Sequence, residues 1–300
     1  MHPGTADRGP ARDLPLPGEE SARAGGPVTV AHRGASAYAP ENTLAAVDAA
    51  ARLGVTWVEN DVQRTRDGEL VVLHDTTLER TTDVRRRFPG RAPWNVGDFT
   101  LAEIATLDAG GWFGAGFAGA RVPTLRDFLR RLTEHRQSLL LEIKSPRLYP
   151  GIERQILAEL REEGWLDADN VRHRLVVQSF DAHAVRAVRA LRPDVKTGFL
   201  GTPAIGDLPA YAEFADQINP CHRTVSAGYV AAVHALSGAR GRPLEVYVWT
   251  VDGGPAAVDV ARLGVDGVIS NTPDAVRDAL ARACGGPAPA GGGAPAAAPA

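Results

Sequence analysis

The sequence contains little cysteine, little lysine and no long apolar run. Its two cysteines, Cys221 and Cys284, cannot form a disulfide framework, and such usage is typical of a reducing cytoplasm. No apolar run approaches the ~20 residues of a membrane-spanning helix, and the first 27 residues lack the apolar core of a signal peptide. A formal net charge of −3 argues against nucleic acid as a partner. These absences predict a soluble cytoplasmic protein without stable membrane association.

The ends of the chain differ in composition from its middle. Residues 285–300 read GGPAPAGGGAPAAAPA, which is low in complexity and too poor in large apolar groups to pack. Residues 1–26 are also expected to form a disordered tail. With 300 residues and 44% hydrophobic content, the chain suits one large soluble domain or two small ones. The folded part is expected over residues 27–284, as a single barrel domain.

Short β-rich runs alternate with amphipathic helical patterns along this domain. The runs are expected at 28–33, 56–61, 138–144, 174–180, 195–200, 216–220, 244–251 and 266–270. Helical patterns with start and stop signals follow several of them, at 42–54, 124–136, 181–193, 255–264 and 273–283. Eight strands alternating with helices predict an α/β fold, a closed (β/α)8 TIM barrel. An open, doubly wound sheet is the alternative, although the chain lacks its Gly-rich phosphate loop.

One connection is too long for this pattern. About sixty residues separate the second run from the helix at 124, and we predict a small cap insertion at about 76–122. Thr100 and Glu103 have the spacing of a capping box and predict a short helix inside it. Several aromatic residues suggest that the insertion packs: Trp94, Phe99, Trp112, Phe113 and Phe117.

The second run continues into a predicted hairpin. Asp67-Gly68 between alternating apolar residues is a strong hairpin signal. With these two as the central turn residues, Asp61 lies opposite His74, whereas a three-residue turn would shift the pairing by one. Glu59 shares a face with Asp61 because strand side chains alternate. The hairpin therefore directs two acids and a histidine to the same side.

Polar residues stand at the carboxyl ends of other strands, where barrels of this type build their active sites. They are His32, Arg33, Glu142, Lys144, Gln178 and Trp249. Carboxylates from two neighbouring strands suit one divalent cation that prefers oxygen, Mg²⁺ or Ca²⁺. Histidines beside a cation, with an Arg/Lys pair, indicate acid–base chemistry on an anion such as a phosphate ester.

The chain has only two lysines, Lys144 and Lys196, in an arginine-rich background. Lys144 follows Glu142 by two residues on the same face, where a compact ammonium suits a crowded site better than a guanidinium. Lys196 is expected to precede its strand and to tolerate arginine.

A series of motifs, in order, resembles the glycerophosphodiester phosphodiesterase family. The motifs are HRG (32–34), PENT (40–43), E-x-D (59–61), T-x-DG (65–68), VVLHD (71–75), LEIK (141–144), VWTV (248–251) and GVDGVISNTPD (264–274). Each motif alone is weak, but together they cover about residues 28–280. The sequence departs from the family pattern at Asn60, expected to face away from the site, and at Asn271, where an acid is common.

The resemblance implies metal-dependent hydrolysis of glycerophosphodiesters to sn-glycerol 3-phosphate and an alcohol, through attack of a glycerol hydroxyl and a cyclic phosphate. It implies that Glu59, Asp61 and Glu142 hold the cation and that His32 and His74 are the acid/base pair. Arg33 and Lys144 would contact phosphate. The remaining candidates for substrate contact are Gln178, Trp249 and, as a possibility, Glu41.

Two other functions stay open at this point. The same site could act on lysophospholipids, which would need an apolar groove or patch. A non-catalytic binding barrel is the other alternative, although the intact histidines and carboxylates argue against it. A small-molecule substrate is the expected partner, and the chain is expected to be a monomer or homodimer.

Overall fold

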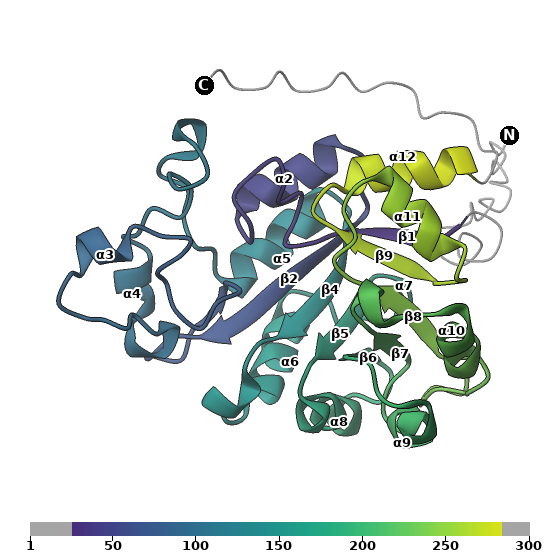
Figure 1. The fold of residues 1–300 in the computed structure, drawn as a ribbon. Coiled ribbons are helices and arrows are strands. Elements are labelled where there is room, and N and C mark those ends of the chain that lie inside the picture. The colour runs from purple at the N-terminus through teal and green to yellow at the C-terminus, as the bar shows by residue number, and fades with distance from the viewer. Residues whose placement is uncertain (1–25, 284–300) are drawn as a thin grey trace, which may run out of the picture.

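The computed structural model describes residues 26–283, which form a closed parallel (β/α)8 barrel (Figure 1). The strands of the ring are β1 (Val28–Ala31), β2 (Trp57–Arg64), β4 (Ser138–Ile143), β5 (Leu175–Ser179), β6 (Lys196–Leu200), β7 (Gln217–Asn219), β8 (Glu245–Val248) and β9 (Gly267–Ser270). β1 pairs with both β9 and β2, so the sheet closes on itself. An open doubly wound sheet lacks such a pairing, and the barrel prediction is confirmed.

Helices surround the ring. They are α2 (Leu44–Arg52), α5 (Leu125–Glu134), α6 (Ile152–Glu162), α7 (Ala168–His173), α8 (Ala182–Leu191), α9 (Leu208–Ala212), α10 (Ala227–His234), α11 (Gly254–Ala261) and α12 (Pro273–Ala283). Short 3-10 turns precede three of these helices: η3 (Pro146–Leu148), η4 (Ile205–Asp207) and η5 (His222–Thr224). The side chains of Thr43, Thr124 and Asp181 accept backbone N–H groups at the predicted helix starts. Helix α6 follows Gly151 with no capping side chain, and its start therefore has no sequence signal.

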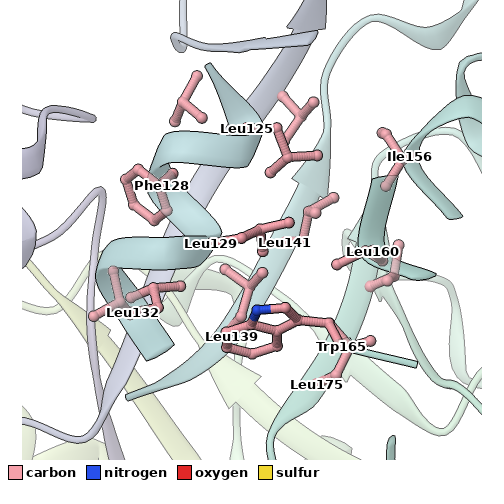
Figure 2. Packing of buried hydrophobic residues seen from close by; sticks show 14 of the residues in the cluster. Leu125, Phe128, Leu129, Leu132, Leu139, Leu141, Ile156, Leu160, Trp165 and Leu175 are labelled. Atoms are coloured by element: carbon pink, nitrogen blue, oxygen red, sulfur yellow. The ribbon is translucent and has the colours of Figure 1, made fainter. Parts of the chain in front are cut away.

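The main core lies between the strands and the helices. Leu125 and Leu129 of α5 face Leu139 and Leu141 of β4, and Leu160 of α6 completes this layer (Figure 2). All five side chains are fully buried. Burial of one such side chain is worth about 1.5–3 kcal/mol. This layer therefore holds β4 in place, together with the residues at its carboxyl end.

β2 extends beyond the ring and pairs with the antiparallel strand β3 (Leu70–Val72). Val62 lies opposite Val72, so the register that placed Asp61 opposite His74 is wrong by one residue. The turn contains three residues, because Thr65 pairs with Glu69 through the backbone and Gly68 takes a φ of 93°. The side chain of Thr65 also accepts the backbone N–H of Glu69 and so stabilises the wider turn.

The insertion after the hairpin lies to the left of the barrel in Figure 1, at the far end of β2. It contains α3 (Val84–Arg87), η1 (Val96–Asp98), α4 (Leu101–Ile104) and η2 (Ala115–Phe117). Thr100 and Glu103 form the predicted capping box. A separate core holds the segment together, and its fully buried members include Leu78, Phe99 and Leu107.

Lys196 is the first residue of β6, so the prediction that it precedes the strand is wrong. Its ammonium lies 2.5 Å from Glu245 Oε2, and the amide of Gln217 donates to the same oxygen at 2.9 Å. Glu245 and Gln217 open β8 and β7. The three side chains meet at the amino-terminal end of the barrel, an association that local sequence does not reveal.

None of the helices in residues 26–283 combines the length and apolar character needed to span a bilayer. Cys284 and the tails predicted at 1–26 and 285–300, apart from Gly26, lie outside the described residues. The domain boundaries, the cytoplasmic location and the monomeric or homodimeric state stay predictions.

Candidate active site

Three carboxylates meet at the carboxyl end of the barrel. Glu59 and Asp61 point to the same side of β2, and Glu142 lies beside Asp61 in the register of β4. One oxygen from each lies within 4.8 Å of the others, and the residues are only 2%, 1% and 6% exposed. Within the described residues, this is the one group of His, Cys, Asp or Glu with such spacing.

Burial and mutual repulsion make this cluster costly when it is fully ionised. Burial, followed by the charge of Asp61, raises the pKa of Glu142 to about 8 and the pKa of Glu59 well above its usual value. Burial also opposes ionisation of Asp61, but Lys144 and Arg33 hold its pKa below the usual range. The Lys144 ammonium lies 2.8 Å from Glu142 Oε1 and 3.7 Å from Asp61 Oδ1.

The donor set suits a hard divalent cation. Asp61 Oδ1 is buried without a hydrogen-bond partner, an arrangement that is unfavourable unless another group satisfies the oxygen. Carboxylate oxygens are the ligands that Mg²⁺ and Ca²⁺ prefer. Glu59, Asp61 and Glu142 therefore form a buried acidic group that could hold a metal ion.

His32 and Arg33 follow β1 in a tight turn. Arg33 takes a φ of 57°, and its backbone N–H donates to Glu59 Oε2 at 2.8 Å. His32 Nδ1 lies 2.7 Å from Asn271 Oδ1, so the proton resides on Nδ1 and Nε2 is left as an acceptor. Burial and then the charge of Arg33 lower the pKa of His32 to about 4. His32 is therefore neutral at pH 7.

His74 follows β3 and has a different partner. Its Nδ1 lies 2.7 Å from Asp75 Oδ1, and Arg80 from the insertion donates to both oxygens of Asp75. Arg80 also donates to both oxygens of Glu41, which accepts a further bond of 2.7 Å from Arg33. Hydrogen bonds from Arg80 help to lower the pKa of Asp75. Glu41 thus connects the turn carrying His32 to the segment carrying His74.

The remaining two candidates lie on other strands: Gln178 is on β5, beside Glu142 in the register, and Trp249 directly follows β8. Gln178 Oε1 accepts from Asn219 Nδ2 at 2.8 Å, and Trp249 Nε1 donates to the Asn219 carbonyl at 2.8 Å. Trp249 packs edge-on against Phe180, whose ring centroid lies 5.6 Å away. The Lys144 ammonium is 5.6 Å from the same Phe180 ring, so this aromatic pair borders the charged cluster.

The structure brings all the predicted residues to one end of the barrel and adds others. Asn42 donates to Asp61 Oδ2 at 2.8 Å, and Asn271 also pairs with Asp252. The PENT and VVLHD motifs contain Asn42 and Asp75, but the roles of Arg80 and Asn219 have no local signal. Asn60 is completely buried, and neither atom of its amide has a partner.

Comparisons with known proteins agree over nearly all of the described chain. A model of the glycerophosphoryl diester phosphodiesterase family matches residues 32–275. A glycerophosphodiester phosphodiesterase of Caldanaerobacter subterraneus is 34% identical over 255 residues, 82% of this chain and 95% of that protein. A Bacillus subtilis enzyme of the same name is 32% identical over 267 residues, 82% of this chain and 84% of that protein.

The fold of this chain also resembles that of a solved phosphodiesterase structure. An Oleispira antarctica phosphodiesterase, in complex with the product sn-glycerol-3-phosphate, matches with a TM-score of 0.74 and 27% identity. The match covers 86% of this chain and 98% of that one. The range of the family model contains every site residue described above.

Proposed function

Since the chain belongs to the glycerophosphoryl diester phosphodiesterase family, we propose that it hydrolyses glycerophosphodiesters to sn-glycerol 3-phosphate and an alcohol. The observation that carries this proposal is the buried carboxylate cluster, in which one Asp61 oxygen has no hydrogen-bond partner. The sn-glycerol-3-phosphate in the Oleispira enzyme supports the choice of product.

Glu59, Asp61 and Glu142 would hold one divalent cation, Mg²⁺ or Ca²⁺. A bound cation supplies positive charge that stabilises the negative charge developing on phosphate oxygens. Arg33 and Lys144 contribute further positive charge at the rim of the cluster, where they can contact the phosphate. Gln178 and Trp249 would line the substrate side, while Glu41 holds Arg33 in place.

The two histidines have partners suited to opposite tasks. Neutral His32, held through Nδ1 by an amide oxygen, can take a proton at Nε2 from the attacking glycerol hydroxyl, and water then opens the resulting cyclic phosphate to sn-glycerol 3-phosphate. His74 pairs with the carboxylate of Asp75, which can hold an imidazolium by a charge-assisted hydrogen bond. His74 can therefore give a proton to the departing alkoxide.

The first test is hydrolysis of glycerophosphocholine with and without EDTA. Turnover that stops on chelation and returns with Mg²⁺ or Ca²⁺ supports the proposal. Undiminished turnover in excess EDTA contradicts the metal assignment, and absence of turnover under every metal condition contradicts the activity.

The second test separates the histidines. His74→Ala should reduce activity on glycerophosphocholine by roughly 10²- to 10⁴-fold and spare a p-nitrophenyl ester, whose leaving group needs no proton. His234→Ala is the matched control, because His234 also pairs with an aspartate, at 2.8 Å from Asp266. Equal losses on both substrates would show that His74 is not the acid.

A specific observation favours lysophospholipids as a second substrate class. The exposed large apolar residues of the described chain are Trp112, Leu148, Phe180 and Ile205. Trp112 lies in the insertion between β3 and α5, and the other three lie in connections from a strand to the following helix, which form the catalytic face of such a barrel. Hydrolysis of lysophosphatidylcholine, reduced by Leu148→Ser and Ile205→Ser, is the result that would support this class.

A further inference from the structure

Gln63 lies on the same side of β2 as Glu59 and Asp61, two residues beyond Asp61. It is completely buried. Its Nε2 lies 2.7 Å from the Leu73 carbonyl oxygen and 2.6 Å from that of Asp75, with the His74 carbonyl at 3.3 Å. Three consecutive carbonyl groups around His74 therefore converge on one amide.

The Gln63 amide thus donates hydrogen bonds to this segment as the backbone of a neighbouring strand would. β3 ends at Val72, and the backbone of Leu73 donates a last ladder bond to Asp61. Beyond this point the chain turns toward the site, and the Gln63 amide donates hydrogen bonds to the carbonyl groups that the strand no longer pairs. The backbone position of His74 depends on that amide because buried carbonyl groups need donors.

Only an amide has the chemistry that this position requires. Nε2 donates to the carbonyl groups, while Oε1 accepts from the Tyr149 hydroxyl at 3.0 Å. Burial raises the pKa of Tyr149 to about 12, so the phenol keeps its proton and donates. A carboxylate would repel the carbonyl groups, and an apolar side chain would leave them unsatisfied.

We propose that Gln63, held by Tyr149, is a positioning residue that sets the place from which His74 delivers its proton. The proposal rests on the proposed function, in which His74 is the general acid. It requires that loss of the amide harm the reactions that need a proton and largely spare those that do not.

The test compares Gln63→Met with Gln137→Met in the metal-loaded enzyme. Gln137 is also buried and donates to a carbonyl group, that of Val55 at 2.8 Å, but it lies just before β4 at the opposite end of the barrel. The measurement is kcat/KM on glycerophosphocholine and on the p-nitrophenyl ester. Misplacement of a catalytic group by 1 Å costs roughly 10²-fold, and Gln63→Met should lose about that much on the choline ester alone.

Gln137→Met should leave the ratio between the two substrates unchanged. Tyr149→Phe removes only a hydroxyl group and should shift the ratio in the same direction by less, which provides a test if Gln63→Met does not fold. Equal losses on both substrates in Gln63→Met and Tyr149→Phe would overturn the proposal.

If His74→Ala discriminates between the substrates and these variants do not, Gln63 has no positioning role while the proposed function stands. If His74→Ala itself does not discriminate, the acid assignment fails and this proposal fails with it.

Discussion

Each end of the barrel contains one of the two lysines beside a glutamate, and the two ends differ in how their charges balance. At the amino-terminal end, Lys196 pairs with Glu245, and Gln217 satisfies the same carboxylate oxygen. At the carboxyl end, Lys144 pairs with Glu142. There, however, Glu59 and Asp61 add two further buried acids.

The difference separates a balanced ion pair from a pair inside an acidic cluster that could hold a metal ion. Lys196 and Glu245 form a closed pair, so no further ion is needed at that end. The carboxyl end has more acids than cations in contact with them, two acids with raised pKa values and an Asp61 oxygen without a hydrogen-bond partner. Buried charge that remains uncompensated is unfavourable by itself, so this cluster could hold a metal ion.

The largest expected effect comes from removing one acid at each end. Glu142→Gln should lower kcat/KM on glycerophosphocholine by roughly 10³-fold, because charge stabilisation by a metal is worth several kcal/mol. Glu245→Gln should keep kcat/KM and lower the melting temperature, since Lys196 loses its partner. Steady-state kinetics and Mg²⁺ or Ca²⁺ titration calorimetry measure both variants. Similar kinetic losses in the two variants would remove the distinction between the ends.

A smaller effect is expected from exchanging the lysines for arginine. Lys144→Arg should lose roughly 10²-fold in turnover, because a planar guanidinium does not fit between Glu142 and Asp61 as the ammonium does. Lys196→Arg should retain turnover and lose about 1 kcal/mol of stability through its pair with Glu245. Kinetics and urea unfolding provide the two measurements. Near-native kcat/KM in Lys144→Arg would place Lys144 outside the catalytic machinery.

The smallest effect concerns the pH dependence of metal-free stability. The folded-state pKa of Glu142 is raised from an ordinary 4.5 to about 8. Its contribution to the free energy of unfolding is therefore fully present below pH 4.5 and is lost as pH rises through about 8. The lowered pKa of His32 changes the free energy of unfolding only below pH 6.5, the ordinary pKa of a histidine. The melting temperature in EDTA should therefore fall as pH rises from 6.5 through about 8.

The same two variants provide the controls for this measurement. Glu142→Gln should make the fall smaller, because the amide does not titrate while Glu59, whose pKa is also raised, still does, whereas Glu245→Gln should leave it unchanged. A metal-free melting temperature that rises over this interval in the wild-type protein would contradict the raised pKa.

Local periodicity was sufficient to predict the barrel and to place several polar residues together at its strand ends. The two-residue period of a strand places Glu59 and Asp61 on one face, and the predicted strand ends bring Glu142 beside them. The order of the motifs added the roles proposed for the histidines. Helix starts at Thr43, Thr124 and Asp181 followed from the side-chain chemistry of caps.

What sequence could not predict depends on particular side-chain contacts, some within one turn and others between distant segments. The observed hairpin register differs from the predicted one by one residue because the Thr65 side chain stabilises a three-residue turn. Arg80 and Glu41 meet across 39 positions of sequence, and no periodic pattern encodes that pair. The ion pair of Lys196 likewise depends on neighbouring strands of the closed ring.

The closure of the barrel also has a consequence for the order in which the protein matures. His32 and Asn271 stand 239 positions apart, and they meet because β1 pairs with β9. During synthesis, β1 and β2 emerge early, but the partner of His32 emerges only after nearly the whole barrel. A chain that stops before β9 can contain all three acids and both histidines and still lack the partner that orients His32. Catalytic competence should thus appear late and abruptly along the growing chain, when the last strand joins the first.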